Sequence, residues 1–286
     1  MGHGPAAWGR LPFPTVTTYA RPVPIDEVLP LRNRYREETE GQIVHDSIHR
    51  RPGWTRAYLV ERAGTTAGYG LMAVAGPWVE KPTLFEFYLL PEHRGAMFHL
   101  FAALVETSGA RFIETQTNSG ALATMMFVWS GDAASEKIVF HDRFATTHSA
   151  NGVVLRRLTP EEEIRRAIEQ RQGGGEWILE SNGQEIARGG VLFHYNPPHG
   201  DVYMSVAKPW RRRGLGTYLV QELKRETRRL GQIPCARCSP ENLASRHTLQ
   251  RAGFVPWGHM LTGSIRTAEA EVTPAATPTP PPTVRS

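Results

Sequence analysis

Residues 210–219, WRRRGLGTYL, place three consecutive arginines beside two glycines, at a point where a strand is expected to give way to a helix. The first turn of a helix offers main-chain N–H groups without internal partners, and the positive end of its dipole favours anions. Gly214 and Gly216 would let a diphosphate approach the main chain closely, and the arginines would add charge-assisted hydrogen bonds. The stretch predicts a diphosphate cradle, although neither the G-x-G-x-x-G nor the G-x-x-x-x-G-K-[ST] nucleotide motif is present.

Positive charge is concentrated around this stretch. Between Lys208 and Arg251 there are eleven Lys or Arg against three Glu, in a chain whose net charge is only +5. A nucleic-acid surface or an ordinary charged turn would also give a basic segment. Because no aromatic stacking platform is interleaved with the arginines, we expect no nucleic-acid partner.

A second motif begins 26 residues after Gly216, in residues 242–254, NLASRHTLQRAGF. With both motifs, residues 153–265 resemble the GNAT family of N-acetyltransferases. The acyl-CoA motif of that family is Gln/Arg-x-x-Gly-x-Gly/Ala after a central strand, and its second motif is Asn-x-x-Ser or Ala ending in Gly-Phe. Residues 211–216 match the first motif position by position. The second motif is matched by Asn242, Ser245, Gly253 and Phe254.

The resemblance implies where acetyl-CoA, the acyl donor, would bind. In this family the strand before the first motif separates from its neighbour and pairs with the pantetheine arm, which here assigns residues 206–208. The diphosphate would lie on the amides of residues 212–217, with Asn242 and Ser245 near the thioester. The expected cofactor-binding residues are Val206, Ala207, Lys208, Arg211, Arg212, Arg213, Gly214, Leu215, Gly216, Thr217, Asn242 and Ser245.

The resemblance also implies direct transfer of the acetyl group to an amine, which needs a base for the ammonium and an acid for the thiolate. Many members use a tyrosine seven residues after the motif asparagine as the acid, but that position is Leu249 here. Ser245 is the expected substitute, with water as the alternative. Asp201 opens the central strand near where the family often places a carboxylate, and is the expected base. His194 and His199, with an ordinary pKa of about 6.5, are alternatives, and a structural role for Asp201 at the strand entry stays open.

The first half of the chain repeats the order of elements with a weaker motif. Aligning residues 92–98, EHRGAMF, with residues 210–216 places Phe98 where Gly216 stands. A phenyl ring there would block the approach of a phosphate. We therefore expect the first half not to bind CoA, but to shape the acceptor site or stiffen the interface.

We expect neither a metal nor a redox site. His45 and His49 have the spacing of a metal pair on a helix, but no third ligand is evident. Cys235 and Cys238 form CARC, but no second pair of ligands exists, and their odd offset on a strand directs the thiols to opposite faces. We interpret both cysteines as reduced and non-catalytic.

Strand and helix patterns occur in the same order in both halves. In the second half, Thr159 and Glu162 predict a helix opened by a capping box, and Asn182-Gly183 predicts a hairpin turn. A later helix is expected to open at Ser239, before a final pair of strands in residues 254–265. The order predicts an α/β fold, with a mixed (α+β) sheet and helices on both faces, as two tandem GNAT folds.

Composition suggests how the chain divides. We expect an N-terminal extension over residues 1–24, a degenerate GNAT-like domain over 25–150, an acetyl-CoA-binding GNAT domain over 151–266, and a disordered Pro-rich tail over 267–286. Neither a signal peptide nor an apolar run of ~18 residues is apparent, so a cytoplasmic location without a membrane partner is expected. Either a monomer or a homodimer is expected.

Together these features favour an acyl-CoA-dependent N-acetyltransferase that acts on a primary amine of a small molecule or peptide. Because Leu249 replaces the common tyrosine and the first half is degenerate, a CoA-binding regulator without turnover is the alternative.

Overall fold

The computed structural model describes residues 17–170 and 176–266 of the 286-residue chain, so the expected tail and most of the expected extension lie outside it. The N-terminal half contains β1 (Thr18–Val23), α1 (Ile25–Glu38), β2 (Thr55–Arg62), β3 (Thr65–Ala73), β4 (Thr83–Leu89), α2 (Met97–Ser108), β5 (Phe112–Gln116), α3 (Gly120–Trp129) and β6 (Ala134–Asp142). The C-terminal half contains β7 (Val154–Arg157), α4 (Pro160–Gln170), β8 (Trp177–Ser181), β9 (Gln184–Leu192), β10 (His199–Val206), α5 (Leu215–Arg229), β11 (Ile233–Cys238), α6 (Leu243–Arg251) and β12 (Phe254–Ser264).

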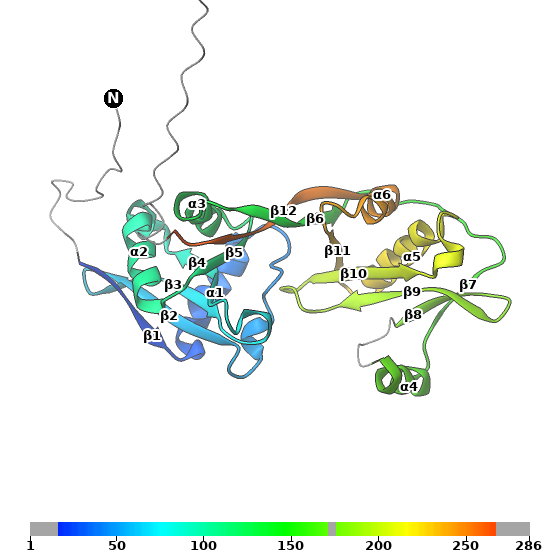
Figure 1. The fold of residues 1–286 in the computed structure, drawn as a ribbon, viewed down its shortest axis with the longest axis horizontal. Helices are drawn as coiled ribbons and strands as arrows, with labels where there is room; N and C mark the ends of the chain where they lie inside the picture. Colours follow the sequence, from blue (N-terminus) through cyan, green and yellow to red (C-terminus); the bar gives the residue numbers. More distant parts are fainter. Residues whose placement is uncertain (1–16, 171–175, 267–286) are drawn as a thin grey trace, which may run out of the picture.

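One mixed sheet of 12 strands runs through both halves, in the order β1-β2-β3-β4-β5-β12-β6-β11-β10-β9-β8-β7 (Figure 1). The parallel pairs are β4 with β5 and β10 with β11, and a crossover helix connects each pair: α2 in the first and α5 in the second. Helices α2 and α3 cover one face of the N-terminal part of the sheet and α1 covers the other. The expected mixed α/β fold with helices on both faces is confirmed. No helix within the described ranges combines the length and apolar character needed to cross a membrane.

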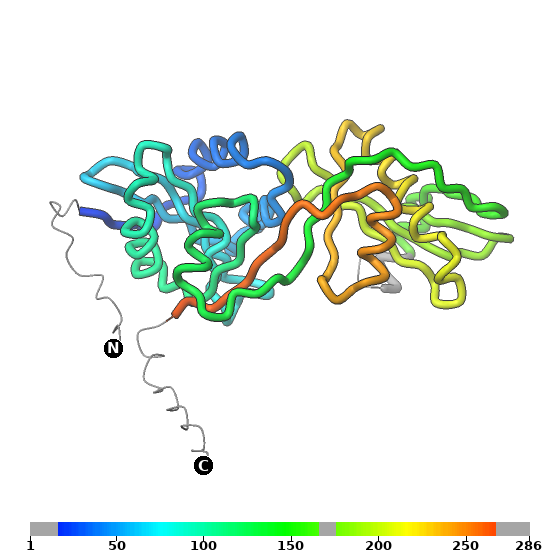
Figure 2. The backbone as a smooth tube through the Cα atoms, turned by 90° about the horizontal axis from the view of Figure 1, so that it is seen from above, coloured from blue at the N-terminus to red at the C-terminus, as the bar shows by residue number. Residues whose placement is uncertain are grey.

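The last strands of the two halves are exchanged. β12 leaves the C-terminal half and pairs with β5, where Met260 lies opposite Gln116. β6, which ends the N-terminal half, pairs with β11, where Phe140 lies opposite Ala236. Figure 2 shows β6 and β12 running beside each other across the middle of the molecule. The expected division at residues 150 and 151 falls between β6 and β7, so each half completes its sheet with a strand from beyond that division.

The exchanged strand β6 carries part of the C-terminal core. Phe140 is fully buried against α5 and α6, in one cluster with Leu219, Leu223 and Leu249. Full burial of an aromatic side chain of this size contributes about 2–3 kcal/mol relative to exposure. The core of the C-terminal half therefore depends on a residue from the N-terminal half.

Local turns follow the predictions from sequence. Asn182 and Gly183 have φ angles of 50° and 75°, as the tight hairpin turn between β8 and β9 requires. Glu162 N donates to Thr159 Oγ1 at 3.3 Å, and Thr159 N donates to Glu162 Oε2 at 2.9 Å, which is the expected capping box.

Two predictions for the last elements are wrong. Helix α6 begins after Asn242, whose Oδ1 accepts from Ser245 N at 3.0 Å. Ser239 does not cap this helix, because its hydroxyl donates to Glu241 in the turn before it. The expected final strand pair is the single strand β12, because the pairing with β6 shifts register within Pro256–Gly258 without reversing direction.

The two cysteines lie on opposite faces of β11, as their offset predicted. Cys235 packs with Tyr195 and Met260 on one face, whereas Cys238 joins the core beneath α5 on the other. Both thiols are free and buried, and burial raises the pKa of each. Thiolate chemistry at neutral pH is therefore disfavoured at both positions.

A buried lysine fastens the end of β6 to helix α5. Lys224 Nζ lies 2.7 Å from Asp142 Oδ1 and donates to Phe144 O at 2.8 Å and to Ala252 O. Burial lowers the pKa of Lys224, and the Asp142 carboxylate opposes that shift. The lysine therefore connects both halves through one ion pair and two hydrogen bonds.

Replacing Lys224 with methionine is expected to reduce the free energy of unfolding by about 3 kcal/mol, because the change leaves buried acceptors without a donor. Arg225→Met is a matched control on the same helix, since Arg225 pairs with Glu222 at the surface and such pairs contribute about 0–1 kcal/mol. Urea unfolding of both variants measures the difference. Equal losses in the two variants would contradict a fastening role for Lys224.

Candidate functional site

The candidate site begins where β10 and β11 separate. The two strands pair only at their first three residues, from His199 opposite Ile233 to Asp201 opposite Cys235. Beyond that point β10 continues to Val206 paired with β9, while β11 continues paired with β6. The edges of β10 and β11 that face each other are thus unpaired along the second half of both strands. The separation that the family resemblance implied is present.

Main-chain groups on the free edge of β10 alternate in direction. Ala207 N donates to Ile186 O at 3.0 Å, so this amide is already used on the β9 side. By the alternation of an antiparallel pair, the main-chain groups of Val206 face the gap. Arg211 Nε donates to Val206 O at 3.0 Å across this edge. Val206 and Ala207 were both assigned to the pantetheine arm. The main-chain groups of Val206 point toward the gap, whereas the Ala207 N–H points toward β9.

Lys208 belongs to the turn that leads from the strand into the arginine-glycine loop. Residues Lys208–Trp210 form one turn of 3-10 helix, and α5 then begins at Leu215. Between them Arg212 and Gly214 are left-handed, with φ angles of 62° and 79°. A left-handed residue followed by a helical one turns successive N–H groups toward one point, which is an arrangement that binds anions.

The amides of this loop are available to a ligand. Among the residues that the structure describes, no acceptor contacts the main-chain N–H groups of residues 212–217, and helix α5 has no side-chain cap. A Cβ added at Gly216 would lie 3.4 Å from Met204 Cε and Thr248 Cγ2, so neighbouring side chains do not exclude one. A Cβ added at Gly214 would meet no neighbouring atom, so it is the positive φ of this residue that favours glycine. The loop geometry matches the predicted diphosphate cradle.

Three arginines border the loop without an acidic partner in the described part of the chain. Arg211 is held by the main chain of Val206, and the Arg213 guanidinium lies 4.9 Å from the centre of the Trp210 ring. All three guanidinium groups are exposed. Because no carboxylate neutralises Arg211, Arg212 or Arg213, the mouth of the gap is positively charged.

Helix α6 begins beside this loop and presents the second motif. The Asn242 side chain caps the helix through Ser245 N, so its oxygen already has a structural task. Ser245 is half-buried, and Thr248, one turn further on, approaches Gly216. Leu249 is buried in the core under α5 and α6 and carries no acidic group.

Asp201 lies at the last paired residue before the gap, on the sheet face opposite α5 and α6. Its neighbour Val202 points into the core with α5, so alternation along the strand directs Asp201 to the other face. The carboxylate is 5% exposed, and its Oδ2 lies 3.3 Å from His194 Nε2 and 3.5 Å from Arg237 Nε. The structure therefore brings Asp201 and His194 together, and it adds Arg237.

His199 does not join this group. Its Nδ1 contacts Asn196 O at 3.2 Å, and burial lowers its pKa. Sequence reasoning missed Arg237, although its place on β11 two residues after Cys235 assigns both side chains to one face. The sequence does not show that Arg237 lies next to Asp201, because the two residues are on different strands.

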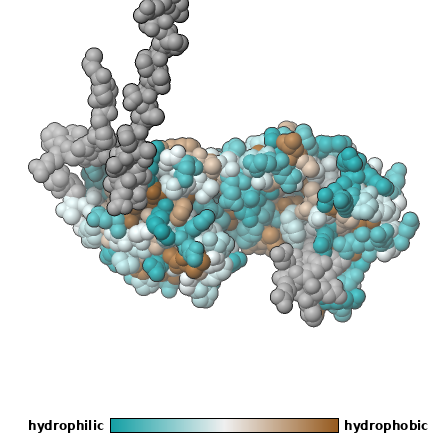
Figure 3. Space-filling view, in the orientation of Figure 1, coloured by the Kyte–Doolittle hydropathy of each residue, from teal (hydrophilic) through white to brown (hydrophobic). Residues whose placement is uncertain are grey.

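The N-terminal half holds the segment that carries His194. Ser47 N donates to His194 O at 3.2 Å, and Ile43 N donates to Asn196 Oδ1 at 2.5 Å. Asn196 Nδ2 donates back to Gly41 O at 3.3 Å. The surface is hollowed between the two halves on the lower side of Figure 3. This junction holds the segment that places the imidazole beside Asp201.

His45 and His49 have separate partners instead of sharing a metal. The His45 ring pairs with Glu114 of β5, and His49 Nε2 lies 3.0 Å from Arg32 Nη1. Within the described residues no group of three or more His, Cys, Asp or Glu has the arrangement of a metal site.

The sequence profile of the acetyltransferase (GNAT) family matches residues 144–254. Both motifs fall within this match, and so do β10 and β11, the two strands that separate. The C-terminal half belongs to the GNAT family. A comparison of the chain with curated proteins found no match.

Solved structures extend the likeness to both halves. A GNAT-family acetyltransferase from Colwellia psychrerythraea matches 86% of this chain and 99% of its own, with a TM-score of 0.70 and 12% identity. A tandem GNAT protein from the clavulanic acid biosynthesis pathway matches 88% of this chain and 100% of its own, with a TM-score of 0.58 and 15% identity. A GNAT protein from Sphaerobacter thermophilus matches 87% and 96%, with a TM-score of 0.54 and 15% identity. At these identities the likeness concerns the fold, and it confirms the tandem GNAT fold.

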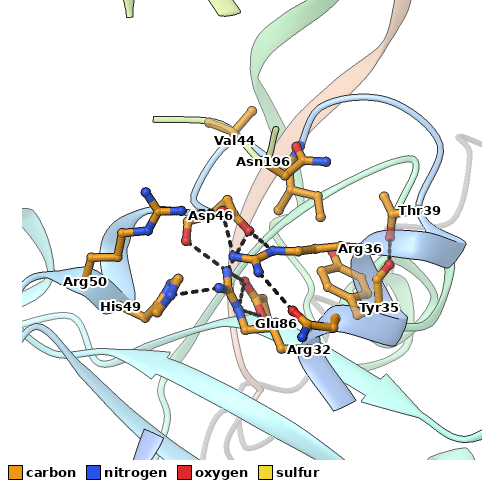
Figure 4. Close-up of polar contacts among 12 residues, drawn as sticks. Arg32, Tyr35, Arg36, Thr39, Val44, Asp46, His49, Arg50, Glu86 and Asn196 are labelled. Carbon is orange, nitrogen blue, oxygen red and sulfur yellow. Dashed lines mark hydrogen bonds and ion pairs between the residues drawn. The ribbon is translucent and has the colours of Figure 1, made fainter. Parts of the chain in front are cut away.

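The first GNAT fold fills its own gap. β4 pairs with β5 at only two positions, so the strands separate here as well. Tyr35 of α1 reaches the end of the gap, and its hydroxyl donates to Ser119 Oγ at 3.2 Å. Fully buried Arg32 donates to both oxygens of Glu86 on β4, at 2.9 and 2.7 Å, and also pairs with Asp46 (Figure 4). Side chains of α1 thus pair with β4, and Tyr35 reaches from Tyr88 of β4 to Ser119 beyond β5.

The loop of the first GNAT fold also has a different shape. Pro91–Ala96 form a continuous 3-10 helix, and Ala96 has a φ of −104° where the aligned Gly214 has 79°. Phe98, at the position aligned with Gly216, is 48% exposed over the start of α2. These features support the prediction that the first half does not bind CoA.

Proposed function

We propose that the protein is an acetyl-CoA-dependent N-acetyltransferase that acts on a primary amine of a small molecule or peptide. We further propose that only the C-terminal half holds acetyl-CoA. The observation that carries the proposal is the open gap between β10 and β11, which ends in a loop of unpaired N–H groups and three unneutralised arginines. The gap suits a narrow extended arm, and the loop suits a diphosphate.

The parts of this site would divide the binding between them. Main-chain groups of Val206 would pair with the pantetheine arm, while residues 212–217 and their arginines would hold the diphosphate. The thioester would then lie between the separated strands, near Ser245 at the start of α6. Acetyl-CoA supplies the activated acyl group, and the chain supplies position and proton transfer.

The proposed chemistry joins the amine nitrogen to the acetyl carbon as the carbon–sulfur bond breaks. The proton leaving the ammonium would pass to Asp201, whose Oδ2 has His194 Nε2 beside it at 3.3 Å. The departing thiolate would take a proton from Ser245 or from water. Arg237, at 3.5 Å, holds the carboxylate on the acceptor side.

A CoA-binding regulator is the second candidate. It is favoured by one observation, the burial of Leu249 at the position where many GNAT members have an acidic tyrosine. Titration of acetyl-CoA, combined with assay of CoA release over a panel of primary amines, separates the two functions. Tight binding without release on any amine would favour the regulator.

Replacing Asp201 with asparagine is expected to lower kcat about 100- to 1,000-fold, the range for loss of a general base, with little change in acetyl-CoA affinity. The rising limb of the pH–rate profile should flatten, because asparagine cannot accept the ammonium proton. Asp201→Glu is the matched control and should retain part of the rate. An unchanged rate and pH profile in Asp201→Asn would remove Asp201 from the mechanism.

A further inference from the structure

A cavity of about 260 Å³ lies where β6 and β12 run together, beside the paired ends of β10 and β11. His199 lines it from the start of β10, seven residues before Val206. At about 3.3 Å per residue, that places the two residues about 23 Å apart along the strand. The cavity, here called the crossing cavity, is therefore separate from the acyl-CoA loop.

Two imidazole rings line the crossing cavity, and each keeps one nitrogen as a free hydrogen-bond acceptor. His141 Nε2 lies 2.5 Å from Gln42 Oε1, and the other end of that amide donates to Phe140 O. His141 must therefore donate through Nε2 and keep a lone pair on Nδ1. His199 donates through Nδ1 to Asn196 O, which leaves its lone pair on Nε2.

Burial favours the neutral form of both rings. Burial, with smaller contributions from His199 and Arg143, lowers the pKa of His141 to about 4. Burial also lowers the pKa of His199. The cavity thus holds two acceptors that carry no charge, and they suit a ligand rich in N–H donors.

Two opposite charges border the cavity without ion-pair partners in the described chain. Glu40 lines it from the segment after α1, and Arg143 lines it from the end of β6. The third charged lining residue, Asp142, is neutralised by Lys224 and Arg228. One carboxylate and one guanidinium are therefore free to contact a ligand of mixed charge.

An aromatic wall completes the cavity. The Trp257 ring stacks on His141 with centres 4.5 Å apart and planes inclined by 16°, and the Arg143 guanidinium lies 5.5 Å from its centre. Trp257 and Glu40 also line a neighbouring hollow that opens toward Asn118. The volume is just below the range of about 300–1,000 Å³ for drug-sized ligands, so the occupant must be small.

We propose that the crossing cavity binds a small zwitterionic amine of the α-amino acid class. Its carboxylate contacts Arg143, and its ammonium contacts Glu40 and the free nitrogens of His141 and His199. Its carbon skeleton packs on Trp257. Because β6 and β12 both contribute, the site exists only when the two halves have exchanged strands.

Isothermal titration calorimetry with the whole protein tests the proposal, without acetyl-CoA. The probes are the standard amino acids, together with two single-charge analogues of valine: 2-methylpropylamine, which lacks the carboxylate, and 3-methylbutanoate, which lacks the ammonium. At least one amino acid is expected to bind in the millimolar range or tighter. If valine binds, each analogue should bind at least tenfold more weakly. If none of the amino acids binds at a concentration of about 10 mM, the proposal is overturned.

Substitutions locate the bound amino acid. Glu40→Gln and Arg143→Met should each weaken binding at least tenfold, whereas the exposed Glu37→Gln on α1 should not change it. Wild-type amino-acid affinity in both cavity variants would overturn the assignment. Acetyl-CoA affinity should be normal in Glu40→Gln, so this site and the proposed acetyltransferase site succeed or fail independently.

Discussion

Gly216→Val is expected to lower acetyl-CoA affinity about 10- to 100-fold, equivalent to about 1.4–2.8 kcal/mol, while the fold stays intact. Valine is chosen because the family motif accepts either glycine or alanine at this position. A Cβ here would meet Met204, Thr248 and Val206 at 3.4–3.5 Å, which the protein tolerates. Those neighbours border the gap, so the two further methyl groups of valine would occupy space that the pantetheine arm and diphosphate need. Valine is also a better helix former than glycine, so thermal stability should be little changed.

Gly95→Val is the matched control, because Gly95 lies in the corresponding loop of the N-terminal half. It has no atom within 4 Å of an added Cβ, and its φ is not positive. Calorimetric titration of acetyl-CoA should give wild-type affinity for this variant. Weaker binding in Gly95→Val than in Gly216→Val would place the cofactor in the N-terminal half and contradict the proposed site.

Features specified by neighbouring residues were predictable. The hairpin turn at Asn182-Gly183 and the capping box at Thr159 depend on residues that are close in the sequence. The spacing of these residues is therefore enough to predict the local conformation. The arginine-glycine loop is local in the same sense. Where two local signals competed, prediction failed, since Ser239 and Asn242 are both good helix caps and only the turn formed by residues 239–241 selects Asn242.

Features that depend on distant segments were not predictable. The strand pair expected in residues 254–265 is one strand, β12, because its neighbours β5 and β6 come from the other half and the sequence of the strand does not specify them. Likewise, nothing in the sequence places Arg237 beside Asp201, because the contact depends on how β10 and β11 separate. The acceptor side of the site is built from such contacts, whereas the acyl-CoA side is built from one loop.

The two halves also differ at the base position. The alignment of loops places Thr83 of β4 where β10 has Asp201, so the first half lacks the carboxylate as well as the cradle. What it retains is the separation of strands, where Tyr35 of α1 donates to Ser119 beyond β5. Its contribution to the proposed reaction is therefore positional, through the loop that holds His194 and through strand β6.

Residues 151–266 expressed alone are expected not to fold, whereas residues 133–266 are expected to fold and bind acetyl-CoA. The shorter fragment lacks β6, so the core under α5 loses Ile138 and fully buried Phe140, and Lys224 loses Asp142. Removal of one large buried side chain costs about 2–5 kcal/mol, and the loss of several approaches the total stability of about 5–15 kcal/mol. The longer fragment restores these contacts, and it differs from the shorter one only by β6 and the segment between β6 and β7.

Circular dichroism on heating and acetyl-CoA titration distinguish the fragments. The longer fragment should unfold cooperatively and bind acetyl-CoA with near-normal affinity, but without residues 41–47 it should turn over poorly, because His194 and Asn196 lose their contacts with the N-terminal half. Co-expression of residues 17–150 with residues 151–266 should restore both folding and turnover. Cooperative unfolding of the shorter fragment at the wild-type temperature would show that β6 is dispensable, and that the exchange of strands does not join the two halves into one folding unit.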